Sequence, residues 1–401
     1  MLMRPARMRR AAIRDRTILV PAAGAQLIAT TGMYIVPVLL DALHGAAGLA
    51  DSAASLLVTI ELAASALTTL TVSAWAPSHS LRRGALLGGL TAIAGAALTL
   101  VAPALPLLAA ARLLTGIGGG IVIAESAAVL ARGLDKERLI AALTIISILN
   151  AALWLAVLPY AIDLFGYRGP YGALLLLGLV GTALLRRLPA PPVRHKAVRR
   201  QTRDADVVAR HWRWPLVLVA AAIFVTQLGQ GAFWSFEETF GARAGLEDHA
   251  IGLLLSLVTL FLLVGALGAA WAGARFGRLL PILALTGVNA AAILVVATAT
   301  APALFIAANL VQSVTNLSSV IYQLGLAATL DRSGRLVAAS TGLVTLGNGI
   351  GPSLAAALAG TFGPASIGLS VLILTGLAWA GFSLAGAGRP ATPTPAAAGP
   401  A

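Results

Sequence analysis

The chain has 401 residues, of which 58% are hydrophobic and 11% charged, and its formal net charge is +13. It contains no cysteine, which excludes disulfides and thiolate metal sites. So apolar a composition is typical of a membrane protein, and anionic lipid headgroups then account for the basic residues without a nucleic-acid partner.

Twelve largely uncharged stretches of about 20 or more residues are each long enough to cross a hydrocarbon core about 30 Å thick. In the first half, spans 1 to 6 are Thr17 to Leu40, Ser52 to Ala76, Gly84 to Pro103, Leu105 to Ala131, Leu139 to Ile162 and Gly169 to Leu188. In the second half, spans 7 to 12 are Trp214 to Thr239, His249 to Ala274, Leu279 to Thr300, Pro302 to Thr329, Arg335 to Gly360 and Pro364 to Ala387. The Ala-Pro pairs near residues 103 and 302 are expected to separate antiparallel helices. This pattern predicts an all-α polytopic membrane protein with 12 transmembrane helices.

The basic residues predict how the chain is oriented in the membrane. Of the 28 Lys and Arg residues, Arg168 and Arg243 fall in the gaps on one side and Arg112 falls inside a span. All the others lie in the two tails and in the alternate gaps that share the opposite side. By the positive-inside rule that side is cytoplasmic, with both termini, and a bacterial inner membrane is the expected location. The outer side is expected to hold the acidic residues Asp41, Asp51, Asp163, Glu237, Glu238, Glu247 and Asp248.

A hydrophilic segment near the middle divides the chain into two halves of six spans. The expected domains are a basic cytoplasmic tail (1–16), a six-helix bundle (17–188), a cytoplasmic linker (189–213), a second six-helix bundle (214–387) and a disordered tail (388–401). Short matches lie in register in the two halves, such as Leu134-Asp135 with Leu330-Asp331 and Phe165-Gly166 with Phe362-Gly363. This duplication predicts two homologous bundles packed face to face, with a substrate site between them near the middle of the bilayer.

Three local motifs resemble those of a known family. They are Arg112-Leu113-Leu114-Thr115-Gly116-Ile117-Gly118 in span 4, Phe165-Gly166-Tyr167-Arg168 before span 6, and Gly347-Asn348-Gly349-Ile350-Gly351-Pro352 in span 11. With these motifs the chain resembles the major facilitator superfamily over its whole length apart from the tails. The resemblance implies a cavity lined by spans 1, 4, 7 and 10, an arginine linked to proton coupling at position 112, and a self-sufficient monomer. The loop from Ser73 to Arg83 lacks the Asp of the family pattern, so membership of the drug and proton antiporter group stays a hypothesis.

Three ionisable residues, Glu61, Arg112 and Glu125, are predicted inside spans, where a charge must pair or line a water-filled route. Glu61 and Arg112 lie about 14 and 11 Å below the outer ends of their spans, so they could meet. Either they form a fixed ion pair, or Glu61 carries a proton whose binding depends on its neighbour. Glu125 lies about 20 Å further along span 4 and is expected to form a salt link with a loop residue such as Arg82 or Arg132.

Polar side chains recur at helical spacing on three spans, and such faces must point inward in lipid. The predicted substrate-cavity residues are Gln26, Thr30, Tyr34, Gln227, Gln230, Trp234, Asn309, Gln312, Asn316, Ser319 and Gln323. Amides and aromatic rings of this kind suit a neutral ligand that combines hydroxyl or other polar groups with aromatic surface. The alternative is that the amides only join helices across buried contacts.

Small residues at i and i+4 let helix backbones approach closely. We expect Gly116, Gly120, Gly347 and Gly351, together with Pro352, to serve helix packing or to act as pivots.

The sequence therefore predicts a secondary active transporter for a small organic molecule, driven by an ion gradient, with proton-coupled efflux as the first hypothesis. It requires no cofactor, and its partners are the lipid bilayer and the transported solute. An importer or uniporter of sugar-like metabolites is an alternative, as is a sensor or scaffold with the same fold. No ATP-binding loop, metal cluster or catalytic triad spacing indicates an enzyme.

Overall fold

The computed structural model describes residues 18–74, 81–102, 104–130, 136–188, 214–273, 275–330 and 335–387. Within these residues, eleven helices are long and apolar enough to cross a membrane. They are α4 (Asp51–Ala74), α5 (Leu81–Val101), α6 (Leu105–Leu130), α7 (Lys136–Phe165), α8 (Arg168–Leu185), α10 (Trp214–Ser235), α12 (Asp248–Ala272), α13 (Leu279–Thr298), α14 (Pro302–Leu330), α15 (Arg335–Phe362) and α16 (Ala365–Ala387). They match spans 2 to 12 and confirm the predicted all-α membrane fold. The expected tails (1–16 and 388–401) and linker (189–213) lie outside the described residues.

Span 1 is broken into short pieces, which explains why it is missing from these long helices. The pieces are Ile18–Ala29, α2 (Thr31–Tyr34), α3 (Val36–Asp41) and a π-helical turn, η1 (Ala42–Ala46). Ile35, between α2 and α3, has φ −98° and ψ 17°, outside the helical range. Pro37 lacks an N–H and cannot bond the carbonyl four residues earlier, so a break at this point is the expected result.

Span 7 is broken as well. Helix α10 ends at Ser235, and the short helix α11 (Glu237–Arg243) begins after Phe236, whose φ of −110° and ψ of 14° are close to those of Ile35. The predicted single helix from Trp214 to Thr239 was therefore too long, and Glu238 lies beyond the break. The first span of each half is therefore kinked.

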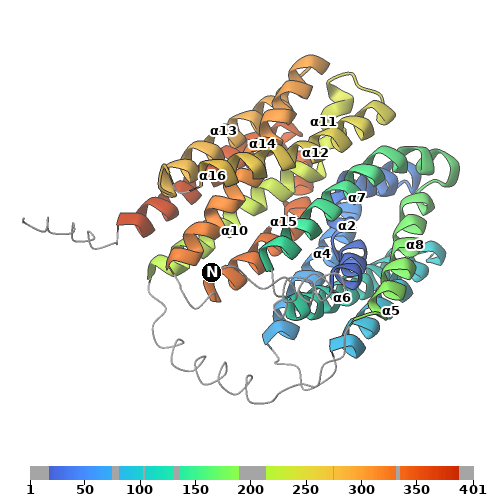
Figure 1. Cartoon of the computed structure of the whole chain (residues 1–401). Helices are drawn as coiled ribbons and strands as arrows, with labels where there is room; N and C mark the ends of the chain where they lie inside the picture. Colours follow the sequence, from blue (N-terminus) through green and yellow to red (C-terminus); the bar gives the residue numbers. More distant parts are fainter. Residues whose placement is uncertain are drawn as a thin grey trace, which may run out of the picture.

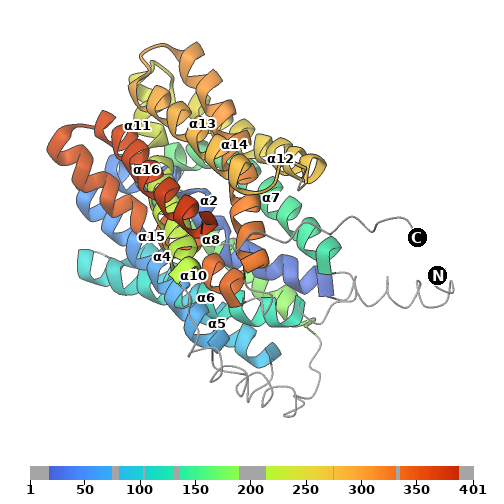
Figure 2. The same cartoon turned by 90° about the vertical axis from the view of Figure 1, so that its left-hand side faces the viewer.

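The helices form two groups that follow the two halves of the sequence. In Figure 1 the first half, blue to green, lies on the right and the second half, yellow to red, lies on the left. The two groups touch where α15 packs on α4 and where α7 packs on α12, and Figure 2 shows α15 beside α4 from the side. A cluster of buried residues joins Leu57 and Leu155 of the first half to Ile251 and Leu255 of α12.

The glycines predicted to serve packing lie at close helix crossings. A Cβ on Gly116 would overlap the Glu61 carbonyl of α4, and a Cβ on Gly120 would come within 2.7 Å of Thr68. In the second half, a Cβ on Gly347 would come within 2.9 Å of the Phe224 carbonyl, and one on Gly351 would overlap the backbone of α10. The first pair thus lets α6 approach α4, and the second lets α15 approach α10. Next to the buried Pro352, Ser353 Oγ lies 2.8 Å from Thr59 Oγ1 of α4, so α15 is bonded to both halves.

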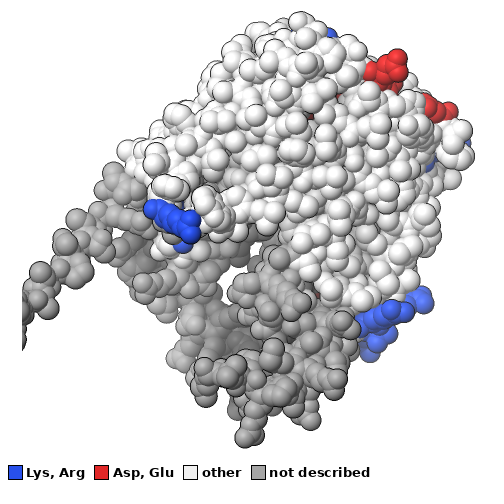
Figure 3. All heavy atoms as spheres, turned by 45° about the horizontal axis from the view of Figure 1, so that its top comes forward, with Lys and Arg blue, Asp and Glu red and all other residues white. Residues whose placement is uncertain are grey.

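The charged residues that the structure describes separate into two ends of the molecule. Figure 3 shows acidic side chains gathered at one end, and the larger basic patches lie away from them. We call the end that holds Asp41, Asp51, Glu238 and Asp248 the acidic end, where η1 and α11 lie and α4 and α12 begin. The opposite end, where α5 begins and α8 and α12 finish, is the basic end and holds Arg82, Arg83, Arg186, Arg187, Arg275 and Arg278.

Candidate substrate and proton sites

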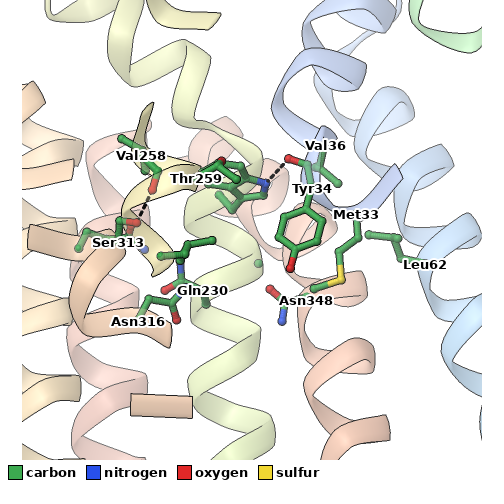
Figure 4. A pocket seen from close by; sticks show the side chains of 14 residues that line it. Met33, Tyr34, Val36, Leu62, Gln230, Val258, Thr259, Ser313, Asn316 and Asn348 are labelled. Carbon is green, nitrogen blue, oxygen red and sulfur yellow. Dashed lines mark hydrogen bonds between the residues drawn. The ribbon is translucent and has the colours of Figure 1, made fainter. Parts of the chain in front are cut away.

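A central cavity lies between the two halves, with a volume of about 90 Å³. Its wall comes from spans 1, 2, 7, 8, 10 and 11, as Figure 4 shows. The lining residues are Met33, Tyr34, Val36, Leu62, Gln230, Gly231, Trp234, Val258, Thr259, Leu262, Gln312, Ser313, Asn316 and Asn348. Pockets for drug-sized ligands usually measure about 300–1,000 Å³, so a ligand of that size would need the two halves to move apart.

A hydrogen bond between the halves borders the cavity, at two of its lining residues. Trp234 Nε1 donates to the carbonyl oxygen of Tyr34 at 3.1 Å, drawn as a dashed line in Figure 4. The helix break at Ile35 leaves that carbonyl without a partner in its own helix, and the tryptophan of the other half satisfies it. The two breaks therefore create a contact that joins span 1 to span 7.

The wall of the cavity combines apolar surface with a few amides. Gln230, Asn316 and Asn348 point toward the space from the second half, and Tyr34 points in from the first. Two of these amides are held by neighbours: Gln230 Oε1 accepts from Asn289 at 3.3 Å, and Asn348 Nδ2 donates to Gln227 at 3.0 Å. Such a site offers stacking surface together with hydrogen-bond donors and acceptors of fixed direction.

The structure divides the predicted substrate residues into two groups. The residues that line the cavity are Tyr34, Gln230, Trp234, Gln312 and Asn316. The other six are not among its lining residues: Gln26, Thr30, Gln227, Asn309, Ser319 and Gln323. Among these, Gln227 supports Asn348, Gln323 accepts a bond from Thr226 at 3.4 Å, and Thr30 bonds the Gln26 carbonyl at 2.9 Å. Sequence spacing identified the polar faces, but it could not separate the part that meets the cavity from the part that meets a neighbouring helix.

Several lining residues were missed. Met33, Val36, Leu62, Val258 and Leu262 are apolar, and no sequence pattern distinguishes an apolar cavity wall from ordinary membrane helix. Asn348 carried a usable signal, because it is an amide inside span 11 at the centre of a glycine motif.

Glu61 and Arg112 form a buried ion pair inside the first half. Arg112 Nη1 lies 2.9 Å from Glu61 Oε2, and the residues are 1% and 9% exposed. Arg112 Nη2 also donates to Thr99 Oγ1, and the guanidinium carbon lies 4.5 Å from the ring centre of Tyr171. This one arginine, which belongs to α6, is therefore contacted by side chains from α4, α5 and α8.

A second, smaller cavity adjoins Glu61. Its volume is about 30 Å³, and its polar lining comes from Glu61, Ser65 and Thr115. A water molecule needs about 10–15 Å³ on this measure and two or more polar partners, so the cavity has room for water beside the carboxylate. Glu125, on the same helix as Arg112, is 2% exposed and does not line this cavity. Arg132, one of its two predicted partners, lies outside the described residues.

Glu237, expected among the acidic residues of the outer side, begins α11 at the acidic end. The residue is fully buried, and its Oε2 accepts from Asn309 Nδ2 at 3.3 Å. In the part of the chain that the structure describes, Glu237 Oε1 and Asn309 Oδ1 have no hydrogen-bond partner. Burial raises the pKa of Glu237 to about 8, and the bond from Asn309 lowers it in part. No sequence pattern indicates this burial, because Glu237 follows directly after a helix break at Phe236 that was not predicted.

A third cavity, of about 220 Å³, lies at the acidic end beyond the Trp234 contact. Asp41 lines it from the first half, and Glu238 and Asp248 line it from the second. Burial raises the pKa of Glu238 well above its usual range, and the charges of Asp41 and Asp248 raise it further. His44 Nδ1 lies 2.8 Å from Asp51 Oδ1 at the rim of this cavity.

Solved structures of membrane transporters are similar to this chain over nearly its whole length. A D-xylose-proton symporter matches with a TM-score of 0.70 and 14% identity, covering 92% of this chain and 97% of that one. A peptide transporter, POT, matches with a TM-score of 0.69 and 16% identity over 92% and 94% of the two chains. A nucleoside transporter, NupG, matches with a TM-score of 0.67 and 12% identity over 93% and 99%. At these identities the likeness shows a shared fold.

The sequence itself matches a family model, although no curated protein matches it significantly. The model describes the Major Facilitator Superfamily and matches residues 22–236, more than half of the chain. The chain therefore belongs to the major facilitator superfamily, and it is a membrane transporter rather than an enzyme.

Proposed function

We propose that this protein exports a small neutral organic molecule in exchange for protons, with Glu61 as the proton carrier and the central cavity as the ligand site. The observation that carries this proposal is the place of Glu61, which is paired with Arg112 on one side and borders a water-sized cavity on the other. A carboxylate in that place can lose its cationic partner and gain a proton when the helices move.

The cavity wall supports a ligand with apolar or aromatic surface and a small number of hydrogen-bonding groups. Tyr34 and Trp234 offer rings, while Gln230, Gln312 and Asn316 offer amides. The described residues place no charged side chain in this wall, so a strongly charged ligand would lack a counter-ion.

We place the basic end of the molecule in the cytoplasm, with both termini, in a bacterial inner membrane. The support is the segregation of arginines to one end and carboxylates to the other. The Trp234 bond then closes the cavity toward the outside, and the protein works as a monomer in the lipid bilayer.

Transport by purified protein in proteoliposomes tests the proposal. With an imposed pH gradient and a panel of sugars, lipophilic cations and aromatic acids, we expect movement of one ligand against its own gradient and opposite to the proton flow. Glu61→Gln removes the titratable group and should abolish this driven movement. Glu247→Gln, which changes an exposed carboxylate, is the matched control and should leave it intact.

Two other results would change the proposed function. Ligand flow in the same direction as protons would make the protein an importer, and full driven transport by Glu61→Gln would remove Glu61 from the mechanism. If no solute crosses the membrane at all, the proposal of transport fails and the alternative of a sensor or scaffold with the same fold takes its place.

A further inference from the structure

The central cavity and the small cavity at Glu61 are separated by a thin apolar wall. Met33 and Leu62 line both cavities. Leu62 is 7% exposed and belongs to a buried apolar cluster, and the partly buried Met33 packs against that cluster. Figure 4 shows both side chains on the span 1 and span 2 side of the site. A wall of a thioether and an isobutyl group offers no hydrogen bond to a water molecule or a proton.

Both wall residues lie where movement of the halves would act. Met33 belongs to α2, a four-residue piece between the irregular Thr30 and the break at Ile35. Leu62 faces the other half, because a Cβ on Gly349 of α15 would come within 2.9 Å of Leu62 Cβ. The nearby bond from Ser353 to Thr59 ties α15 to the same stretch of α4. A rocking movement that shifts α15 or bends span 1 must therefore displace this wall.

We propose that Met33 and Leu62 form a movable hydrophobic partition between the ligand cavity and the proton site at Glu61. The partition stops water and protons from passing between the two cavities except when the halves move. This inference rests on the proposed role of Glu61. The partition makes proton exchange conditional on the conformational step, which is the requirement for coupling, because a permanently open connection would let protons pass without cargo. Arg112 and, behind it, Tyr171 are the charged and titratable groups that face Glu61 in the described residues.

Proton leak in the absence of any ligand tests the partition. Proteoliposomes with a pH-sensitive dye inside, a clamped membrane potential and an imposed pH gradient report proton flux alone. Trimming both side chains (Met33→Ala with Leu62→Ala) should raise this flux several-fold over the unmodified protein. Adding Glu61→Gln should return the flux to the original level. Leu67→Ala is the matched control, because Leu67 lies on the same helix but is 55% exposed.

Two results would overturn the partition. One is a correctly folded double variant with unchanged proton flux, and the other is a raised flux that persists after Glu61→Gln. Failure of the proposed function would be visible separately, as driven ligand transport that survives Glu61→Gln in the otherwise unchanged protein.

A second measurement protects the test against misfolding of the double variant. Because the chain has no cysteine, Met33→Cys introduces a single thiol. After purification, a small charged thiol reagent would place a hydrated group in the wall of the folded protein. We expect the same Glu61-dependent leak to appear on labelling, and an unchanged flux in fully labelled protein would contradict the partition.

Discussion

Two of the buried glutamates, Glu61 in the first half and Glu237 in the second, are stabilised in different ways. Glu61 in the first half lies 2.9 Å from the guanidinium of Arg112, which Thr99 and Tyr171 also contact. Glu237 in the second half has an amide, Asn309, as its bonded neighbour. A charge buried in low dielectric needs an opposite charge, and the first carboxyl has such a partner. Burial raises the pKa of Glu237, which has only an amide beside it, to about 8.

The difference teaches that the two halves stabilise a buried carboxyl group by different means. The first half keeps a charged pair whose separation would be costly. The second half supplies most of the polar wall of the ligand cavity, including Gln230, Gln312 and Asn316. Four predictions test this contrast.

The largest effect should follow the loss of Arg112. Arg112→Met leaves Glu61 buried without its cation, and we expect the free energy of unfolding to fall by about 3–5 kcal/mol. Denaturant titration in detergent measures it. The double variant Glu61→Gln with Arg112→Met should recover part of the loss, while Arg243→Met at an exposed position should change little. If Arg112→Met were as stable as the parent, the ion pair would make no contribution to the free energy of unfolding.

A methyl group at a close helix crossing should have the next largest effect, and it should act in both halves. Gly116→Ala and Gly351→Ala each place a Cβ into the backbone of a neighbouring helix, which should cost about 1–3 kcal/mol. Gly172→Ala is the control, since nothing lies within 4 Å of its added Cβ. Thermal unfolding of the three variants measures the difference. Equal melting temperatures would mean that the helices can separate without penalty.

Removing the bond between the halves should have a smaller effect, which concerns conformation more than stability. Trp234→Phe deletes the donor to the Tyr34 carbonyl, a loss of about 1 kcal/mol. Distances between spin labels on introduced cysteines at the acidic end should then shift toward larger separations. Trp379→Phe removes a bond to Thr286 within one half and should leave those distances unchanged. The same distances in both variants would exclude the bond as a gate contact.

Glu237→Gln should have the smallest effect at low pH. At pH 5 the carboxyl is neutral in the folded protein, and an amide of similar shape should change stability by less than about 1 kcal/mol. The folded-state pKa of about 8 lies above the usual 4.5, so the parent loses stability as pH rises from about 4.5 to about 8, where the loss levels off. The variant should lack this decline. If the free energy of unfolding varied with pH in the same way in both proteins, the prediction would be wrong, and a cation beside Glu237 would have to stabilise its charged form.

The fold was largely predictable because length and hydropathy determine which segments cross a membrane. Spans 2 to 12 were recognised in this way, and the Ala-Pro corners separate α5 from α6 and α13 from α14 as expected. The breaks at Ile35 and Phe236 were not predicted, although Pro37 was visible in the sequence. Residues 232–240 around Phe236 include no proline or glycine, so tertiary packing rather than local propensity decides where span 7 ends.

The sites were predictable only in part, because helical spacing gives the face of a residue but not its depth or neighbours. The level of Glu61 and Arg112 could be counted along two helices, and the structure pairs them. By contrast, Asn309 has the same spacing signal as Gln312, yet it bonds to Glu237 instead of lining the cavity. Met33 and Leu62 could not be found by spacing at all, since their importance comes from the two cavities on either side of them.

The breaks at Ile35 and Phe236 divide each of the two predicted spans into two segments. We call the segment toward the acidic end the rim and the remaining segment the shaft. The central cavity borders both shafts, at Tyr34 and Trp234, and reaches the first rim at Val36, whereas the acidic cavity borders the rims at Pro37 and Glu238. Each break therefore lies at the border between two cavities, so a change of the backbone angles at Ile35 or Phe236 would alter both cavities at once.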